Sequence, residues 1–264
     1  MPRCPLFLMR LKITIAYDGR PYSGWQSQPG GNTIQDHLHH ALREITQHPI
    51  PVQGSGRTDT GVHALGQVAH FDAPPKTTMK PANWVAALNS KLPATIRIMA
   101  CEEVSADFHA RFSAIGKIYH YDIRTDCVLP PHQAGLAWHL PRPLDVTLLS
   151  AALHCVLGRH DFHAFAAYRG NETMATDYHR TIHTTDLEKL TSGWRITYAG
   201  DGFLYRMVRL LTGAAVKVAQ GKLQPADFCA LLDQGPSLPH GKSPHCAPAD
   251  GVYLQQVLYP KIRR

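Results

Sequence analysis

The chain has 264 residues, of which 44% are hydrophobic, so it can bury a sizeable core and its composition excludes intrinsic disorder as the default state. Its 27 Lys and Arg residues against 20 Asp and Glu residues give a net charge of +7. A basic chain of this size favours an anionic partner, and nucleic acid is the first candidate.

The cysteines and the N-terminal segment both indicate a cytoplasmic protein. Six cysteines lie far apart with no C-x-x-C pair, so we expect reduced thiols. The apolar run at residues 6–9 is too short for a signal-peptide core, and no apolar stretch has the length needed to span a bilayer. We therefore expect no membrane association, and Met9 is a candidate initiator because a strand-like run begins at Leu11.

Strands and helices alternate in the first half. Alternating apolar and polar residues predict a strand at residues 11–16. Thr33 is suited to cap a helix that runs to about Thr46 with one apolar face. The other elements predicted in this half are a strand at residues 67–71, a helix at residues 81–90 that starts with a proline, and a strand at residues 96–104.

The second half repeats this style. A strand is predicted at residues 117–124, and two paired strands at residues 178–187 and 194–200 flank a Ser192-Gly193 turn. Asp145 is suited to cap a helix that runs to about Leu157. The last predicted elements are helices at residues 205–219 and 225–232, a loop at residues 235–248 and a strand at residues 252–258.

Two halves with the same mixture of elements favour an α+β fold. The boundary is expected near residues 107–112, which gives an N-terminal half at residues 1–108 and a C-terminal half at residues 109–264. Both halves combine strands with helices, but they show no repeat at the level of residues.

The most informative segment is the loop at residues 54–64, which reads GSGRTDTGVHA. Its glycines permit positive φ angles and a close approach of a ligand to the backbone. Asp59 follows Arg57 and Thr58 in this loop, and a carboxylate beside a guanidinium suits chemistry next to a polyanion. On the pattern alone, an aspartate that bonds its own turn is the commoner explanation.

Read as a whole, this loop closely resembles the G-R-T-D-x-G-V-H-A signature of the tRNA pseudouridine synthases of the TruA type. In that family the aspartate of the loop is the catalytic residue, and it corresponds to Asp59. Further segments match the family in the same order, so the resemblance covers almost the whole chain. They lie at residues 17–26, 111–121, 161–165 and 203–209.

The resemblance implies roles for other residues. It assigns an active-site tyrosine to Tyr119 and an arginine that faces the catalytic acid to Arg209. By default Tyr119 packs on a strand, and Arg206 and Arg209 form a solvated stripe on one helix face, but for Tyr119 and Arg209 the ordered match outweighs these interpretations. Arg57, Thr58 and Arg206 join Tyr119 as candidate substrate-binding residues, with Arg57 propping the displaced base against phosphates.

The resemblance also implies a fold and an activity. The fold has two similar α/β halves whose mixed, largely antiparallel sheets join across a central active-site cleft, and the protein is a homodimer. The reaction converts uridine to pseudouridine at positions 38, 39 and 40 in the anticodon stem-loop of tRNA. A paralogue that acts on other RNA uridines is the alternative.

The proposed residue types suit this reaction. The bond from C1′ to N1 breaks and a bond from C1′ to C5 replaces it. The substrate gains no atoms, so no cofactor is expected. The uridine must first leave its stack, which costs a few kcal/mol, and stacking on Tyr119 returns about 1–3 kcal/mol. The Tyr119 phenol is also a candidate to help remove the C5 proton.

The acid needs a partner that keeps it ionised. Arg209 opposite Asp59 would favour the carboxylate and orient it through forked donors. Three roles stay open for Asp59: attack on C6 of the base, attack on C1′, or removal of a sugar proton.

Three other classes of protein fit less well. Asp59-Thr60-Gly61 also spells the D-T-G of aspartic proteases, which need two facing carboxylates, but the chain has no second D-T-G or D-S-G. A non-catalytic RNA-binding protein would need the basic charge and an aromatic platform but no acid–arginine pair. A dinucleotide-binding loop would need a third glycine after Gly54-x-Gly56, and a phosphate-binding loop would need a Gly-Lys-Ser/Thr sequence there. Neither stands at the required spacing in this loop.

No metal is expected, because the sets His154, His160 and His163, and His240, His245 and Cys246, lack a zinc-finger spacing. One departure from the family lies at residues 246–251, where CAPADG replaces a Thr-Ala-Pro-Pro-type turn. We expect this segment to touch none of the three main residues, Asp59, Tyr119 and Arg209.

Overall fold

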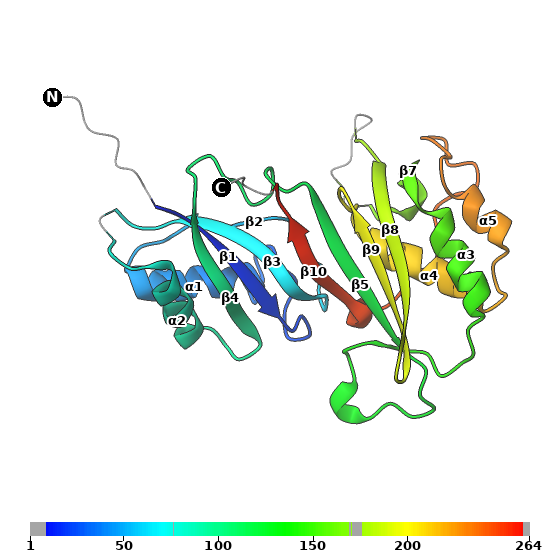
Figure 1. Ribbon diagram of the computed structural model, residues 1–264, viewed down its shortest axis with the longest axis horizontal. Coiled ribbons are helices and arrows are strands. Elements are labelled where there is room, and N and C mark those ends of the chain that lie inside the picture. The colour runs from blue at the N-terminus through cyan, green and yellow to red at the C-terminus, as the bar shows by residue number, and fades with distance from the viewer. Residues whose placement is uncertain (1–8, 76, 169, 171–175, 261–264) are drawn as a thin grey trace. The chain divides into compact units, whose positions relative to one another are not determined.

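A computed structural model describes residues 9–75, 77–168, 170 and 176–260 (Figure 1). The chain divides into two compact units, one made of Met1–Ile115 with Leu254–Arg264 and the other of Gly116–Tyr253. The last strand, β10 (Val252–Leu258), thus runs from the second unit into the first, whereas the expected boundary after residue 108 keeps that strand in the second half.

In the first unit, antiparallel strands carry two helices on one face (Figure 1). The strands β1 (Arg10–Tyr17) and β3 (His63–Asp72) pair with each other, and β4 (Ile96–Val104) pairs with β1. The short β2 (Gln53–Gly54) pairs with β3, and β10 follows β3 in the strand order. Alternate residues of β1 are fully buried, as its pattern predicts: Leu11, Ile13 and Ile15.

The two helices of this unit confirm the helix predictions. α1 (Ile34–Thr46) begins after a reciprocal capping box, in which the Thr33 hydroxyl accepts from the Asp36 N–H and the Asp36 carboxylate accepts from the Thr33 N–H. α2 (Pro81–Lys91) begins at the predicted proline. The strand β3 is longer than predicted, because Ala64, expected in the loop, pairs with Tyr17 at the end of β1.

The second unit is a further antiparallel ladder with its own helices. Its strand order is β5 (Gly116–Arg124), β9 (Gly193–Gly200), β8 (His179–Leu190) and β7 (Gly158–Asp161), and β6 (Trp138–His139) pairs in parallel with β5. The helices α3 (Val146–Cys155), α4 (Met207–Ala219) and α5 (Pro225–Ala230) pack against one another. α4 also meets the sheet, since the hydroxyls of Thr212 on α4 and Tyr198 on β9 share a hydrogen bond of 3.1 Å.

Several predicted boundaries in the second unit are wrong. The turn between β8 and β9 lies at residues 191–192, because Gly193 already pairs with Leu190. α3 and α5 end at Cys155 and Ala230, short of the predicted ends. The cap of α3 at Asp145 is confirmed, because its carboxylate accepts from the Leu148 N–H at 3.0 Å.

The two units together confirm the predicted α+β class, with largely antiparallel sheets. Within the part of the chain that the structure describes, no helix combines the length and the apolar character needed to cross a bilayer.

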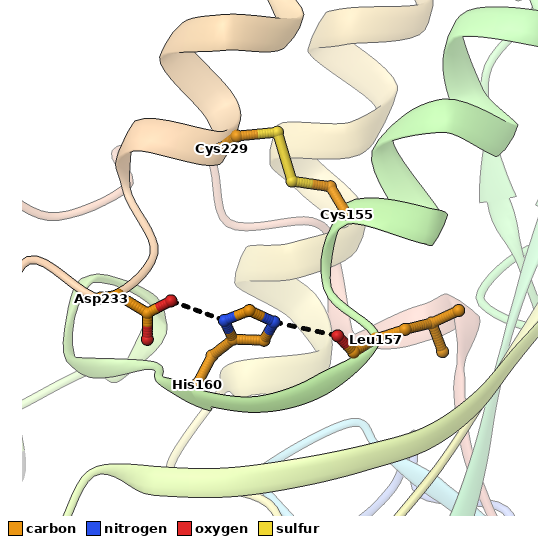
Figure 2. The surroundings of a disulfide bond; sticks show 5 residues. All are labelled: Cys155, Leu157, His160, Cys229 and Asp233. Carbon is orange, nitrogen blue, oxygen red and sulfur yellow. Dashed lines mark hydrogen bonds and ion pairs between the residues drawn. A yellow bond between two sulfur atoms is a disulfide. The ribbon is translucent and has the colours of Figure 1, made fainter.

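A disulfide joins α3 to α5, so the expectation of reduced thiols is wrong for this pair (Figure 2). Cys155 ends α3 and Cys229 lies in α5, with their Cα atoms 6.3 Å apart and their positions 74 apart in the sequence. The positions of the two cysteines in the sequence do not predict this disulfide, because only the packing of the two helices brings the thiols together. Cys101, Cys127 and Cys246 are free thiols.

Candidate active site

The segment that carries Asp59 is a tight turn. The Val62 N–H donates to the Asp59 carbonyl oxygen at 3.1 Å, and Gly61 has a φ of +79°, a backbone angle that favours glycine at the third position of a turn. Gly24 has a φ of +85°, and a Cβ there would lie 2.6 Å from the Thr58 carbonyl oxygen. The residue before Asp59 therefore packs against a backbone position that only glycine fits.

A set of buried polar side chains lies next to this turn. The hydroxyls of Tyr17 and Thr58 share a hydrogen bond of 2.8 Å. The Gln67 side chain accepts from the Ser55 hydroxyl at 2.7 Å and donates to the Gly56 carbonyl oxygen at 3.1 Å. All four side chains that take part are less than 9% exposed. Thr58, predicted to bind substrate, thus has its hydroxyl engaged inside the protein.

The acid and its neighbouring arginine differ in exposure. Asp59 is half-buried and Arg57 is exposed. The loop therefore presents its carboxylate at a partly sheltered position and leaves the guanidinium in solvent, where an anionic ligand can reach it.

A charged cluster fixes the point where the loop enters β3. The Gly19 N–H donates to Nδ1 of the buried His63 at 3.2 Å, and an Asp18 carboxylate oxygen lies 3.3 Å from the same nitrogen. Arg20 pairs with Asp18 at 2.6 Å. Burial alone would raise the pKa of Asp18, but hydrogen bonds from Arg20 and its charge outweigh burial and lower that pKa.

In the second unit, Tyr119 lies on β5 opposite Tyr198 on β9. Its side chain is nearly buried, at 9% exposed. The ring meets Phe203 edge-on, with centroids 5.0 Å apart and planes at 73°. Because Phe203 belongs to the segment before α4, both the strand and the approach to the helix hold the Tyr119 ring.

Arg209 on α4 is held by the loop that follows α5. Its Nε donates to the Ala247 carbonyl oxygen at 2.8 Å, and the Ala247 N–H donates to the Arg209 carbonyl oxygen at 3.0 Å. A Cβ on Gly213, one turn further along α4, would overlap the His245 carbonyl oxygen, so the loop lies directly on the helix. The expectation that residues 246–251 touch none of the three main residues is therefore wrong.

Tyr119 on β5 and Arg209 on α4 lie on the same side of the sheet. Tyr121, two residues beyond Tyr119 on that face, donates from its hydroxyl to the Pro248 carbonyl oxygen at 2.9 Å. Burial raises the pKa of Tyr121 well above its ordinary value, and the nearby charge of Arg209 opposes that rise. The second unit thus brings the predicted tyrosine and arginine to one side of its sheet.

Arg206 does not share a helix face with Arg209, so the stripe that was their default interpretation does not form. Arg206 precedes α4 in a left-handed conformation with a φ of +59°, which is uncommon for a residue other than glycine. The helix therefore begins at Met207, two residues after the predicted start at Tyr205. Arg206 is exposed, with its guanidinium 5.0 Å from the centre of the Tyr205 ring.

The histidines considered as metal ligands have other contacts. His160 lies 2.6 Å from Asp233, and its Nε2 lies 2.9 Å from the Leu157 carbonyl oxygen (Figure 2). His163 stacks on Tyr178 with ring centroids 3.9 Å apart. Among the described residues, no group of three histidine, cysteine or acidic side chains is arranged to hold a metal ion.

Sequence analysis missed Tyr17, Ser55, Gln67 and His63 as residues of this site. Gln67 carried a weak signal, because a glutamine interrupts an otherwise apolar strand pattern. Tyr17 lay inside a segment that matched the family, but the predicted strand ended at residue 16, so Tyr17 was assigned to the turn that follows it.

Comparison with known proteins places this geometry in a family. A family model described as tRNA pseudouridine synthase matches residues 13–113 and 152–260. The chain is 49% identical to tRNA pseudouridine synthase A of Akkermansia muciniphila over 96% of both chains. It is 40% identical to tRNA pseudouridine synthase A 2 of Clostridium perfringens, over 96% of this chain and all of that protein.

A chain in the crystal structure of a Cbf5-Nop10-Gar1 complex is a more remote match. It has 10% sequence identity and a TM-score of 0.34, and the match covers 78% of this chain and 45% of that chain. This similarity is too weak to support any inference.

An α+β chain with the Asp59 loop and these matches is an isomerase of the pseudouridine synthase class. It belongs to the tRNA pseudouridine synthase family.

Proposed function

We propose that the protein converts uridine to pseudouridine at positions 38, 39 and 40 in the anticodon stem-loop of tRNA, with Asp59 as the catalytic carboxylate. The observation that carries this proposal is the turn at Asp59. The acid is half-buried there, and hydrogen bonds with Val62, Trp25 and Tyr17 hold residues 58–59 in place. We propose further that the enzyme works as a cytoplasmic homodimer without a metal or cofactor.

The chemistry is an isomerisation and balances without a second reactant. The bond from C1′ to N1 breaks, a bond from C1′ to C5 forms, the proton on C5 leaves and N1 gains a proton. Asp59 serves this sequence as a nucleophile toward C6 or C1′, or as a base toward a sugar proton.

Arg209 and Tyr119 complete the proposed site. Arg209 would pair with Asp59, keep it ionised and orient it. The bond from its Nε to Ala247 supports this role, because it fixes the guanidinium on one side. Tyr119 would stack on the uracil after it leaves the RNA helix and help to remove the C5 proton.

Two exposed arginines are the proposed contacts to the RNA backbone. Arg57 lies directly before Thr58 in the Asp59 loop, and Arg206 lies at the start of α4. Both are exposed, and arginine pairs readily with phosphate through two parallel hydrogen bonds. The net charge of +7 favours the same partner.

Mapping pseudouridine in tRNA from a strain that lacks this protein tests the proposal. We expect the modification to disappear at positions 38, 39 and 40 and to return with the wild-type gene but not with Asp59→Asn. Unchanged modification at those positions would contradict the proposed substrate. Restoration by Asp59→Asn would contradict the catalytic role of Asp59.

A further inference from the structure

The buried polar side chains next to the Asp59 turn form one connected network. Burial raises the pKa of Tyr17, and hydrogen bonds of its hydroxyl with Thr58 and Gln67 oppose that rise. Gln67 in turn accepts from the Ser55 hydroxyl and from the Val68 N–H, at 2.7 and 3.1 Å. Tyr17 on β1 is thereby linked to β3 and to the loop.

The network ties down the segment that leads to Asp59. Gln67 holds Ser55 by its hydroxyl and Gly56 by its carbonyl oxygen, and Tyr17 holds Thr58 by its hydroxyl. The Thr58 carbonyl oxygen also accepts from the Trp25 N–H at 3.0 Å. The residue immediately before the acid is therefore fixed by both its side chain and its backbone.

Packing alone does not require polar side chains at these positions. Tyr17, Ser55, Thr58 and Gln67 are 5%, 1%, 7% and 0% exposed, and an isolated polar group at such a depth costs free energy unless it is hydrogen-bonded. A buried network whose members are bonded to one another fixes one arrangement of its surroundings. Here that arrangement is the backbone from which Asp59 projects.

We propose that Tyr17, Thr58 and Gln67 are positioning residues of the isomerisation, which act on the reaction by setting the place of Asp59. This inference rests on the proposed catalytic role of Asp59. A misplacement of a catalytic group by about 1 Å can reduce the rate by about 100-fold, so loss of one bond from the network affects turnover more than it affects binding of tRNA.

Two substitutions that each remove one hydroxyl test the proposal. Tyr17→Phe and Thr58→Val change side-chain volume little and break the same hydrogen bond. We expect kcat for tritium release from C5-labelled uridine in tRNA to fall by about 10- to 100-fold, with KM and the Kd for tRNA changed by less than a few-fold. Thr58→Ser, which keeps the hydroxyl, should recover most of the kcat that Thr58→Val loses.

The combination of the two changes sharpens the test. Tyr17→Phe and Thr58→Val remove the same hydrogen bond. The kcat of the double variant should therefore be close to that of the less active single variant. If the fold-loss in kcat of the double variant equals the product of the two single losses, the two residues act separately. That result would overturn the shared hydrogen bond as the cause of the loss.

Tyr22 offers a matched control in the same unit. It is 5% exposed, and its hydroxyl shares a hydrogen bond of 2.5 Å with the Thr95 hydroxyl, just before β4. Tyr22→Phe therefore removes the same kind of bond away from the Asp59 turn. We expect it to lower the thermal midpoint about as much as Tyr17→Phe does while kcat stays at the wild-type value.

The outcomes separate the two proposals. If Asp59→Asn is inactive while folded Tyr17→Phe and Thr58→Val turn over like Tyr22→Phe, the positioning role is overturned and the role of Asp59 stands. If Asp59→Asn retains turnover, the role of Asp59 fails and the positioning role fails with it. Circular dichroism confirms folding, and should Tyr17→Phe not fold, the pair Thr58→Val and Thr58→Ser decides.

Discussion

Two hydrogen bonds join Arg209 and Ala247. The Arg209 Nε donates to the Ala247 carbonyl oxygen at 2.8 Å, and the Ala247 N–H donates to the Arg209 carbonyl oxygen at 3.0 Å. The pair joins the first turns of α4 to the loop after α5. Since one donor of the guanidinium is committed to this loop, the orientation of the other donors is set within the second unit. Arginine suits such a position better than lysine, which has a single rotatable ammonium.

Arg209→Lys keeps the charge but loses the forked donors. We expect kcat to fall by about 10-fold or more, because the carboxylate loses its oriented partner, while the Kd for tRNA changes less than a few-fold. Arg195→Lys is the control, since Arg195 forms a similar two-bonded pair with Asp122 at 2.7 and 2.8 Å. A wild-type kcat in Arg209→Lys would remove the orienting role.

Tyr119→Phe keeps the aromatic ring and loses the hydroxyl. Since stacking on a base depends on the ring, we expect tRNA binding to persist while release of the C5 proton slows by about 10-fold or more. Tyr119→Leu should weaken binding as well. Full activity in Tyr119→Phe would exclude the phenol from proton removal.

The disulfide between Cys155 and Cys229 is expected to stabilise the second unit. Chain-entropy reasoning for a loop of this length gives about 4.5 kcal/mol, so the double change to serine should lower the thermal midpoint, and a reductant should lower that of the wild type. Cys127→Ser is the control, because Cys127 is an exposed free thiol. An unchanged midpoint in reductant would argue against a stabilising bond.

The buried His70 is expected to lower the free energy of unfolding in acid. It is 5% exposed and accepts from the Ala110 N–H at Nδ1, 3.2 Å away. Burial, with the charges of His109 and Arg10, lowers its pKa from 6.5 to about 4. Between those two values the unfolded chain binds more protons at this residue than the folded chain does, so stability falls as the pH falls through the window.

The variant His70→Gln should make that dependence shallower. The measurement is the free energy of unfolding in urea across the window, for the wild type and the variant. Equal slopes for the two proteins would show that His70 does not titrate in this way.

Local patterns were sufficient for much of the fold. Thr33, a residue type that caps helices, indicated the start of α1, and alternation identified β1, because both signals depend only on neighbours in the sequence. The candidate acid at Asp59 came from a short loop motif read together with a family resemblance.

Long-range arrangement was not accessible in the same way. The hydrogen bonds that Tyr17 and Gln67 make to the Asp59 loop depend on the register of β1 against β3, and the disulfide depends on the packing of α3 on α5. Arg206 was predicted as the second residue of a helix, because an arginine gives no sign of a left-handed backbone. Contact between Arg209 and Ala247 likewise arises only when the loop folds onto α4.

The central claim is that a single carboxylate, Asp59, carries the reaction, and one measurement tests it most directly. Purified wild-type protein and Asp59→Asn are incubated with tRNA that carries tritium at C5 of uridine, and release of tritium is followed beside the Kd for the same tRNA. We predict no release above background by Asp59→Asn, with a Kd within a few-fold of the wild-type value. Release at a rate near that of the wild type would contradict the claim.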